Sequence, residues 1–441
     1  MEEFENKLAV FAGHLRRDGV LANVARLSGG ANMESWSFDV GDQGYILRRA
    51  PSDALMEGRV FGHDVEAALV RAAFAAGVKA PEIVGELEDV DGLGTGYLMR
   101  RIEAEVNPAK ILSAPPTSLL SDLASELAKI HAIPLAALPD LASTDAQGLL
   151  SDIKTRFLDF GGDRPVMALA LRWLEDCLPA PVDPVLLHGD FRMGNIMADA
   201  NGLAAVLDWE LAHIGDRHQD LAYGCINSWR FGHIDRPAFG LGQLEEYFAA
   251  YEAVSGVAVE PARFRWWLVY STLWWGVCCL QMADIWRSGK DAGLERAVIG
   301  RRASETEVDL LMLLEDYAPE SERGRIATPA PTDIRRLGET SATEMLEAIA
   351  GWVEADVKPN AQGRDRFMAS VALNALGMLQ REVAHSVDVH DKALSEDLLA
   401  GRKSIDTPGV LAQLKTQALV KLAADQPKYS ALGAAIQKWS E

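Results

Sequence analysis

One stretch of the chain, residues 185–210, constrains its fold more than any other. It reads VLLHGDFRMGNIMADANGLAAVLDWE and contains two short apolar runs, VLL and AAVL, each of which ends in polar residues. Asp190 and Asn195 follow the first run, and Asp208 follows the second. Short apolar runs of this kind are typical of buried strands. We expect a loop and the turn of a hairpin to bring these three side chains to one point.

This set of side chains suits one kind of chemistry. In phosphoryl transfer from a nucleotide, one Asp orients the attacking hydroxyl and accepts its proton, while an Asn and a second Asp hold the magnesium ions that bridge the phosphates. Any one of these residues has an ordinary structural explanation, because Asp and Asn often cap turns. Asp190, Asn195 and Asp208 together, in this order, favour phosphoryl transfer over turn capping.

The same stretch resembles the catalytic core of the aminoglycoside phosphotransferase-like, or choline kinase-like, branch of the protein kinase fold. That branch carries His-Gly-Asp-x-x-x-x-Asn where protein kinases have His-Arg-Asp, and here the motif is His188 to Asn195. The resemblance implies that Asp190 is the catalytic base and that Asn195 and Asp208 bind Mg2+. It also implies that ATP is the phosphoryl donor.

Two further residues of this region are expected to support the site. In the resembling family, an Asp at the position of Asp220 begins a helix and holds the catalytic loop through its backbone amides. A helix N-cap would also favour an Asp there. We therefore expect Asp220, together with His188, to be structural support.

The segment from 24 to 40 predicts a strand, a small-residue turn and a second strand. The turn begins with Ser28, Gly29 and Gly30. The backbone N–H groups of such a loop can approach phosphates, although Gly-Gly with Asn is common in any hairpin. The position of this loop upstream of the catalytic stretch favours nucleotide binding.

A third predicted strand, 45–49, ends in two arginines. Kinases have a Lys at this position, and the resemblance implies that Arg48 grips the phosphates in its place, because a guanidinium can hold phosphate oxygens in bidentate fashion. Arg49 competes with Arg48 for this role. The helical partner of the cation is expected to be Glu66, on a helix from about 59 to 76; an exposed helix carboxylate is the alternative explanation.

A further hairpin, 83–88 and 96–102, predicts the hinge between two lobes. The resemblance implies that Met99 lines the adenine pocket and that the backbone from Arg100 to Ile102 pairs with the base. Backbone recognition leaves little trace in side chains, so ATP and GTP both remain open as the donor.

The pattern of the whole chain indicates an α+β, two-lobed, protein-kinase-like fold followed by a small all-α domain. Residues 319–333 contain three prolines and no apolar period, which is typical of a linker. The helices beyond it resemble a small helical domain of unknown function that accompanies such kinases. The expected divisions are a β-rich N-terminal lobe, a helical C-terminal lobe, a linker and a helical domain, at 1–102, 103–320, 321–335 and 336–441.

Composition excludes several classes of partner. The formal charge is 43 minus 64, or −21, which argues against nucleic acid and anionic membrane, since both are bound through clustered Lys and Arg. Four cysteines without metal-ligand spacing and an N-terminus without a signal peptide favour a cytoplasmic protein. The apolar run Trp266 to Leu280 is shorter than a membrane span and predicts a buried helix. The sequence leaves a monomer and a homodimer equally open.

The acceptor is expected to be a small molecule with a hydroxyl group. A wall rich in Trp between 264 and 286 favours an acyl, sterol or aromatic acceptor over a sugar. Gly300-Arg301-Arg302 resembles the kinase-like domain fused to some acyl-CoA dehydrogenases, which suggests a hydroxyacyl-CoA whose phosphates meet Arg301 and Arg302. An aminoglycoside or amino-alcohol acceptor is the first alternative.

Two other classes of function compete with a small-molecule kinase. A protein kinase would carry an Ala-Pro-Glu segment and an activation loop, and neither follows Asp208, since Asp220 lies only 12 positions on. A catalytically weak nucleotide-binding scaffold is suggested by Arg48 and by the imperfect glycine loop. The intact Asp190 and Asn195 argue against that scaffold.

Overall fold

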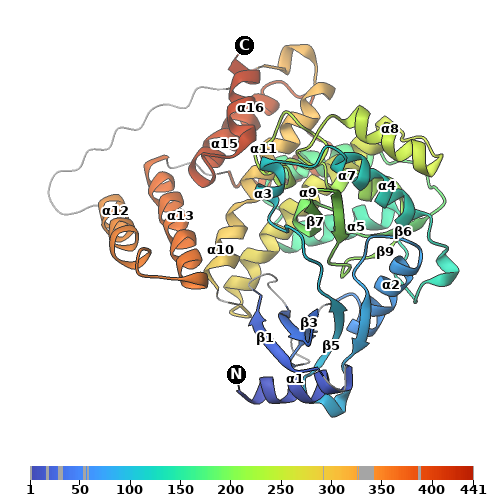
Figure 1. The fold of residues 1–441 in the computed structure, drawn as a ribbon. Coiled ribbons are helices and arrows are strands. Elements are labelled where there is room, and N and C mark those ends of the chain that lie inside the picture. Colours follow the sequence, from blue (N-terminus) through green and yellow to red (C-terminus); the bar gives the residue numbers. More distant parts are fainter. Residues whose placement is uncertain are drawn as a thin grey trace.

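A computed structural model gives the fold of the chain (Figure 1). The residues it describes are 2–15, 19–27, 33–52, 56, 59–291, 293–324, 326, 342–385 and 389–440. The predicted phosphate loop, Ser28, Gly29 and Gly30, therefore lies outside the described residues, as does most of the predicted linker.

A five-stranded antiparallel sheet forms the N-terminal part, in the order β1-β2-β3-β5-β4. Its strands are β1 (Leu21–Arg26), β2 (Glu34–Val40), β3 (Gln43–Ala50), β4 (Ile83–Glu86) and β5 (Thr95–Arg100). Alternate side chains of a strand face opposite sides of its sheet. Tyr45 and Leu47 of β3 therefore pack with Leu8 and Phe11 of α1 (Glu2–Leu15) in one core. Arg48 faces the other side, towards α2 (His63–Ala75).

The middle of the chain is mostly helical, as the sequence predicted. Its helices are α3 (Pro108–Ser113), α4 (Leu119–His131), α5 (Ala146–Asp159), α6 (Pro165–Asp176), α7 (Arg217–Tyr223), α8 (Leu244–Ser255), α9 (Pro261–Arg287), α10 (Leu294–Arg301) and α11 (Ala303–Leu314). The long helix α9 contains the Trp-rich run and contacts α5, α6, α7, α10 and α11. Most of its apolar residues from Phe264 to Cys279 are buried in this core, whereas Trp286 near its end is 45% exposed. No helix among the described residues has the length and apolarity needed to cross a membrane.

Two short ladders position the predicted catalytic stretch. Strand β6 (Val185–Leu187) pairs with β9 (His213–Gly215), and β7 (Ile196–Asp199) pairs with β8 (Gly202–Val206). The two apolar runs of the stretch therefore do not pair with each other: the first joins β9, which follows both runs, and the second joins β7, which lies between them. Asp190 and Asn195 lie between β6 and β7, and Asp208 lies between β8 and β9. These two segments are side by side, which accounts for the approach that the sequence predicted.

The C-terminal part is a group of helices that continues the core. They are α12 (Ala342–Trp352), α13 (Gly363–His385), α14 (Lys392–Leu399), α15 (Val410–Asp425) and α16 (Ser430–Ser440). The sequence predicted one or two helices after residue 392, and the structure has three. Helix α14 packs on α6, and α15 packs on α11 and α13. Figure 1 shows α12 and α13 at the side of the molecule, with α13 next to α10.

Candidate active site

The segment after β6 holds a buried carboxylate between two donors. Asp190 is 7% exposed. Asn195, in the short 3-10 turn Met193–Asn195, donates from Nδ2 to the backbone oxygen of Asp190 at 2.9 Å and to its Oδ2 at 2.5 Å. Arg192 donates from Nε to the other carboxylate oxygen at 2.8 Å. This pairing directs Asn195 Nδ2 towards Asp190 and leaves Asn195 Oδ1 as the oxygen of that amide that can bind a cation.

The surroundings of Asp190 favour its protonated form. Burial raises the pKa of Asp190, and the charge of Asp208 raises it further, while Arg192 opposes the shift. The influence of Asp208 places the two carboxylates in one electrostatic environment. Burial and the nearby Asp190 also raise the pKa of the Tyr223 phenol, which faces this carboxylate. A carboxylate with a raised pKa accepts a proton more readily.

His188 and Asp220 support this loop from behind. The Asp190 amide donates to His188 Nδ1 at 3.2 Å, so Nε2 carries the ring hydrogen and contacts the Leu207 carbonyl at 3.1 Å. This contact ties the loop to the residue before Asp208. Asp220 accepts from the backbone amides of His188 and Gly189 at 2.7 and 2.9 Å.

The predicted helix start at Asp220 is wrong, although its contact with the loop amides is present. Helix α7 begins at Arg217 and its N-cap is Asp216, which accepts from the His218 amide. Asp220 lies inside the helix and is fully buried. Burial alone would raise the pKa of Asp220, but its hydrogen bonds with His131 and the Gly189 amide lower it below the ordinary value. The charged carboxylate can therefore hold the loop.

Asp208 belongs to an ion cluster, centred on Arg48, between the sheet and the helical part. Its φ is +66°, in a region that residues other than glycine rarely occupy. Arg48 donates from Nη2 to Asp208 at 2.8 Å and to Glu210 at 2.9 Å, and its Nε lies 3.7 Å from Glu66. A strained conformation of this kind persists only where the surroundings impose it.

Arg59 and Glu210 complete this cluster, and sequence reasoning did not single out either of them. Arg59 donates from Nη1 to Glu210 at 2.7 Å and from Nη2 to Glu66 at 2.8 Å. We define the ion cluster as Arg48, Arg59, Glu66, Asp208 and Glu210. Arg59 precedes α2 in an irregular segment, so no periodic pattern marks it. The Glu of Asp-Trp-Glu was the only available signal for Glu210.

The cluster keeps Arg48 charged and pairs Glu66 with both of its arginines. Burial opposes the charged form of Arg48, but the attraction of Asp208, Glu66 and Glu210 raises its pKa above the ordinary value. Glu66 is fully buried and also accepts from the Tyr97 hydroxyl at 3.0 Å. The expectation that Glu66 pairs with Arg48 therefore agrees with the geometry, and the alternative of an exposed carboxylate does not.

Arg49 does not take part in the ion cluster. Because neighbouring residues of a strand face opposite sides, the Arg49 side chain lies on the face of the sheet opposite to that of Arg48. There it donates to Glu34 at 2.9 Å and stacks over the Phe4 ring at 4.4 Å. Of the two arginines, only Arg48 therefore lies in the ion cluster with Asp208, and its role in phosphate binding stays a prediction.

The predicted hinge follows β5. Met99 is half-buried and lies opposite Ile46 of β3 and Ile83 of β4. The amides of Arg100 and Arg101 already donate to Glu82 and Gly44 carbonyls, at 2.9 and 3.0 Å. These bonds fix the backbone that leads to Ile102.

A small pocket adjoins the catalytic loop. It has a volume of about 140 Å³ and is lined by Gly189 and Tyr223 and by Tyr270 and Trp274 of α9. Leu149 of α5 and Leu211 add to its apolar wall. Part of the Trp-rich helix thus borders the site, as expected. A cavity of about 150 Å³ with apolar walls is large enough for benzene.

Arg301 and Arg302 have carboxylate partners. Arg301 contacts Glu382 of α13 and Asp425 of α15, at 2.8 Å for the latter. Arg302 donates to Glu305 at 2.9 Å. Arg301 joins α10 to α13 and α15, and Arg302 pairs with a residue one turn further on, so both charges are engaged and their geometry does not favour the expected contact with acceptor phosphates.

The antiparallel sheet and the helical part that follows it define a class of fold: the two-lobed, kinase-like type. Residues 23–257, more than half of the chain, match the model of the Phosphotransferase enzyme family (APH), and the chain belongs to this family. Residues 359–429 match a second model, described as a domain of unknown function (DUF6285).

Similar proteins support the family assignment. Acyl-CoA dehydrogenase family member 10 of Mus musculus is 27% identical over 253 residues, which cover 50% of this chain and 23% of that protein. Acyl-CoA dehydrogenase family member 11 of Gallus gallus is 28% identical over 285 residues, which cover 56% of this chain and 35% of that protein. The match thus spans about a quarter and about a third of the length of these relatives.

A solved structure agrees with the fold. It is a putative aminoglycoside phosphotransferase from Ralstonia eutropha, with a TM-score of 0.56 and 19% sequence identity. The alignment covers 71% of this chain and 98% of that one.

Proposed function

We propose that the chain is an ATP- and Mg2+-dependent kinase that phosphorylates a hydroxyl group of a small molecule. The observation that carries this proposal is that the segment with Asp190 and Asn195 is hydrogen-bonded to the residue before Asp208: His188 Nε2 contacts the Leu207 carbonyl at 3.1 Å, and the Leu207 amide donates to the Asn195 carbonyl at 2.8 Å. Asp190 is the proposed base, because burial raises its pKa and both of its oxygens are oriented by donors. It would orient the acceptor hydroxyl and take its proton.

The oxygens of Asn195 and Asp208 fit a magnesium ion. Magnesium usually takes one or two protein ligands and completes its shell with waters and substrate phosphates. No cluster of three or more His, Cys, Asp or Glu residues that could hold a metal occurs within the described part of the chain. A shell shared with the nucleotide suits two protein ligands. When bound, the ion would neutralise charge that develops on the phosphates.

The proposed nucleotide site lies on the sheet side of the ion cluster. Arg48 Nε and Arg59 Nε are buried and have no hydrogen-bond acceptor among the described residues, so this region is rich in donors suited to phosphate oxygens. Glu66 would orient Arg48. We further propose that Ser28, Gly29 and Gly30 approach the phosphates and that Met99 lines the adenine pocket. The backbone from Arg100 to Ile102 would pair with the base through groups other than the Arg100 and Arg101 amides, which already donate to Glu82 and Gly44.

The proposed acceptor is a largely apolar alcohol, of which a hydroxyacyl-CoA is one example. The pocket beside Tyr223 supports this class through the apolar side chains of Leu149, Leu211 and Trp274 next to the catalytic loop, while His213, Gln219 and Ser271 add polar groups that could meet the hydroxyl. An aminoglycoside or amino alcohol remains the alternative acceptor, and the transfer panel below separates the two classes. We also propose the domain division at residues 102, 320 and 335 that the sequence suggested.

Replacement of the proposed base tests the proposal. In Asp190→Asn, binding of ATP should persist, because the residue contacts no part of the ion cluster directly. Transfer of labelled phosphate from ATP to an acceptor should fall by about 10²–10⁴-fold. Transfer would be measured with Mg2+ against a panel of hydroxyacyl-CoAs, amino alcohols and aminoglycosides, and nucleotide binding by calorimetry.

Asp140→Asn is a suitable control, because Asp140 is exposed and lies outside the site. It should transfer phosphate at the parent rate. Undiminished transfer by Asp190→Asn would rule out the role of Asp190. Nucleotide binding by the parent chain without transfer to any member of the panel would favour the scaffold function.

A further inference from the structure

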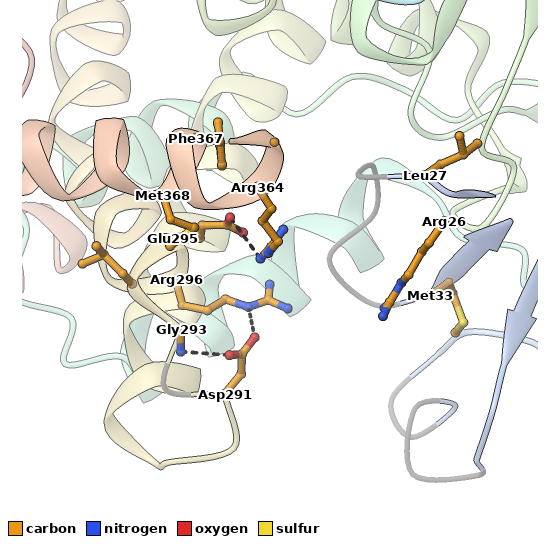
Figure 2. Close-up of a pocket in the computed structure, with 12 residues that line it drawn as sticks. Arg26, Leu27, Met33, Asp291, Gly293, Glu295, Arg296, Arg364, Phe367 and Met368 are labelled. Carbon is orange, nitrogen blue, oxygen red and sulfur yellow. Dashed lines mark hydrogen bonds and ion pairs between the residues drawn. The ribbon is translucent and has the colours of Figure 1, made fainter. Parts of the chain in front are cut away.

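A second, larger recess lies between the sheet and the helices that follow the kinase-like region (Figure 2). Its volume is about 960 Å³. We define it by Arg26, Leu27 and Met33 on the sheet side, and by the lining residues of 291–296 and 363–368 on the opposite side. Ligand pockets for small molecules are commonly about 300–1,000 Å³, so this recess is large enough for a substrate.

Three arginines and two carboxylates, Asp291 and Glu295, line this recess, which makes it locally cationic in a chain whose formal charge is −21. In Figure 2, Arg296 and Arg364 lie on the helical side and Arg26 lies across the gap. Arg364 contacts Glu295 at 3.3 Å, and Arg26 contacts Glu34 at 3.5 Å. These two side chains are 64% and 58% exposed. A guanidinium has five N–H donors, so one carboxylate contact leaves each of them able to bind an anion.

Apolar side chains lie beside these cations. Phe367, one turn from Arg364 on α13, is 55% exposed, and Leu27 on the opposite side is 42% exposed. Met33 and Met368 also line the recess. Exposed apolar surface next to arginines favours a ligand that carries both phosphate and apolar groups.

The recess adjoins the proposed phosphate site. Leu27 and Met33 flank the segment 28–32, and Met33 lies two residues before Ser35 of β2. Ser35 pairs with Arg48 of the ion cluster in the register of β2 and β3. Met33 directly precedes β2, so the sheet side of the recess lies at the end of the strand that carries Ser35. An acceptor held in the recess would therefore extend along this end of β2 towards the ion cluster.

We propose that the recess binds the phosphate-bearing, partly apolar end of the acceptor, and that α13 of the C-terminal region thereby takes part in substrate recognition. This proposal rests on the proposed kinase function. It assigns a role to residues within the part of the chain that matches the domain of unknown function, which begins at residue 359. Arg364 and Phe367 would bind the phosphate and apolar groups respectively.

Calorimetry on the full-length chain tests this proposal without turnover. The probes are decanoyl-coenzyme A, coenzyme A and decanoate, each titrated with the nucleotide site saturated by Mg-ADP. Decanoyl-coenzyme A should bind most tightly, since it alone combines the phosphates with an apolar chain. Arg364→Ala should weaken binding of both coenzyme A probes about tenfold or more. Phe367→Ala should reduce the advantage of decanoyl-coenzyme A over coenzyme A.

Matched controls lie on the same helix. Arg366 and Leu379 are exposed on α13 but do not line the recess, so Arg366→Ala and Leu379→Ala should bind the probes as the parent chain does. Unchanged binding in Arg364→Ala, or no binding of any probe, would overturn the proposal. So would an equal loss of Mg-ADP affinity in Arg364→Ala, because the recess would then belong to the nucleotide. A chain that binds the probes but transfers no phosphate would refute only the kinase function.

Discussion

At the scale of single residues, Gly189 shows how closely the catalytic loop is packed. Its φ is +80°, and a Cβ atom at this position would lie 2.1 Å from the Leu211 carbonyl oxygen. Its amide also donates to Asp220. A side chain here would therefore meet both backbone strain and a fixed backbone atom, and the loop that carries Asp190 would have to move.

Gly189→Ala is predicted to lower the free energy of unfolding by about 2–4 kcal/mol, because strain and overpacking add. Phosphate transfer should fall at temperatures where the variant stays folded. Denaturant unfolding and single-turnover assays would measure the two effects. Gly256→Ala is the matched control: its φ is +68° with no atom within 4 Å of the added Cβ, so it should cost only about 1 kcal/mol. Equal costs in the two variants would contradict the role of the Leu211 contact.

Arg48→Lys tests the ion cluster. A Lys ammonium is a single point of charge and cannot reproduce the contacts that Arg48 makes with Asp208, Glu210 and Glu66. We expect the KM for ATP to rise about tenfold, measured by initial rates at saturating acceptor. Arg49→Lys, one residue along β3 but on the opposite face, should leave the KM unchanged. A larger effect at Arg49 would contradict the assignment.

The sequence predicted the residues that local motifs mark and missed those that only the fold brings near. Asp190, Asn195 and Asp208 lie within one stretch, and alternation along β3 separates Arg48 from Arg49. Arg59, by contrast, meets Glu210 across 151 positions. No spacing rule connects such residues, because their contact depends on how the sheet docks on the helical part.

At the scale of elements, a buried polar group joins α11 to the C-terminal helices. Asp309 of α11 accepts from Asn227 Nδ2 at 3.0 Å and from the Tyr429 hydroxyl at 2.5 Å. Burial raises the pKa of Asp309 to about 7, and Glu305 adds to the shift, while the two hydrogen bonds and Arg230 oppose it. A carboxylate that ionises near neutrality in this position makes the packing of these helices dependent on pH.

Asp309→Asn is predicted to become more stabilising, relative to the parent chain, as pH rises. The pKa of an unfolded Asp is about 3.9, so the folded parent binds more protons than the unfolded chain between about pH 4 and pH 7. The stability that the Asp309 carboxyl contributes to the parent chain is fully present below pH 4 and is lost as pH rises through 7. The difference between variant and parent should grow by roughly 2–4 kcal/mol from pH 4.5 to pH 8. Urea unfolding at several pH values measures it; a constant difference would exclude the shift.

Element boundaries and pairings were predicted unevenly. The amphipathic pattern of 117–131 predicted α4 well, because its buried leucines recur at helical spacing. The pairing of β6 with β9 was missed, since β9 is only three residues long and gives no periodic pattern. The sequence predicted a helix start at Asp220, whereas the N-cap of the helix is Asp216. Each of these two residues is followed by helical residues, and only the buried contacts of Asp220 distinguish them.

At the scale of the whole molecule, the apolar core crosses the proposed domain boundary. One continuous cluster of buried residues runs from α2 through α6, α9 and α11 to α14, α15 and α16. Lys415 of α15 is fully buried and pairs with Glu315, and Trp439 of α16 donates to the same carboxylate at 2.7 Å. A shared core of this kind favours unfolding of both regions as one unit, although the sequence gives each its own helical pattern.

Two core substitutions test this coupling. Leu171 of α6 and Leu414 of α15 are both buried in the continuous core, so Leu171→Ala and Leu414→Ala should each lower the free energy of unfolding by about 2–5 kcal/mol. Because the core is shared, both variants should shift the same calorimetric transition, with the helical part and the C-terminal helices melting together. Leu379→Ala, at a position that is 44% exposed, should shift it far less. Two separate transitions, of which Leu414→Ala moves only one, would show that the C-terminal helices fold independently.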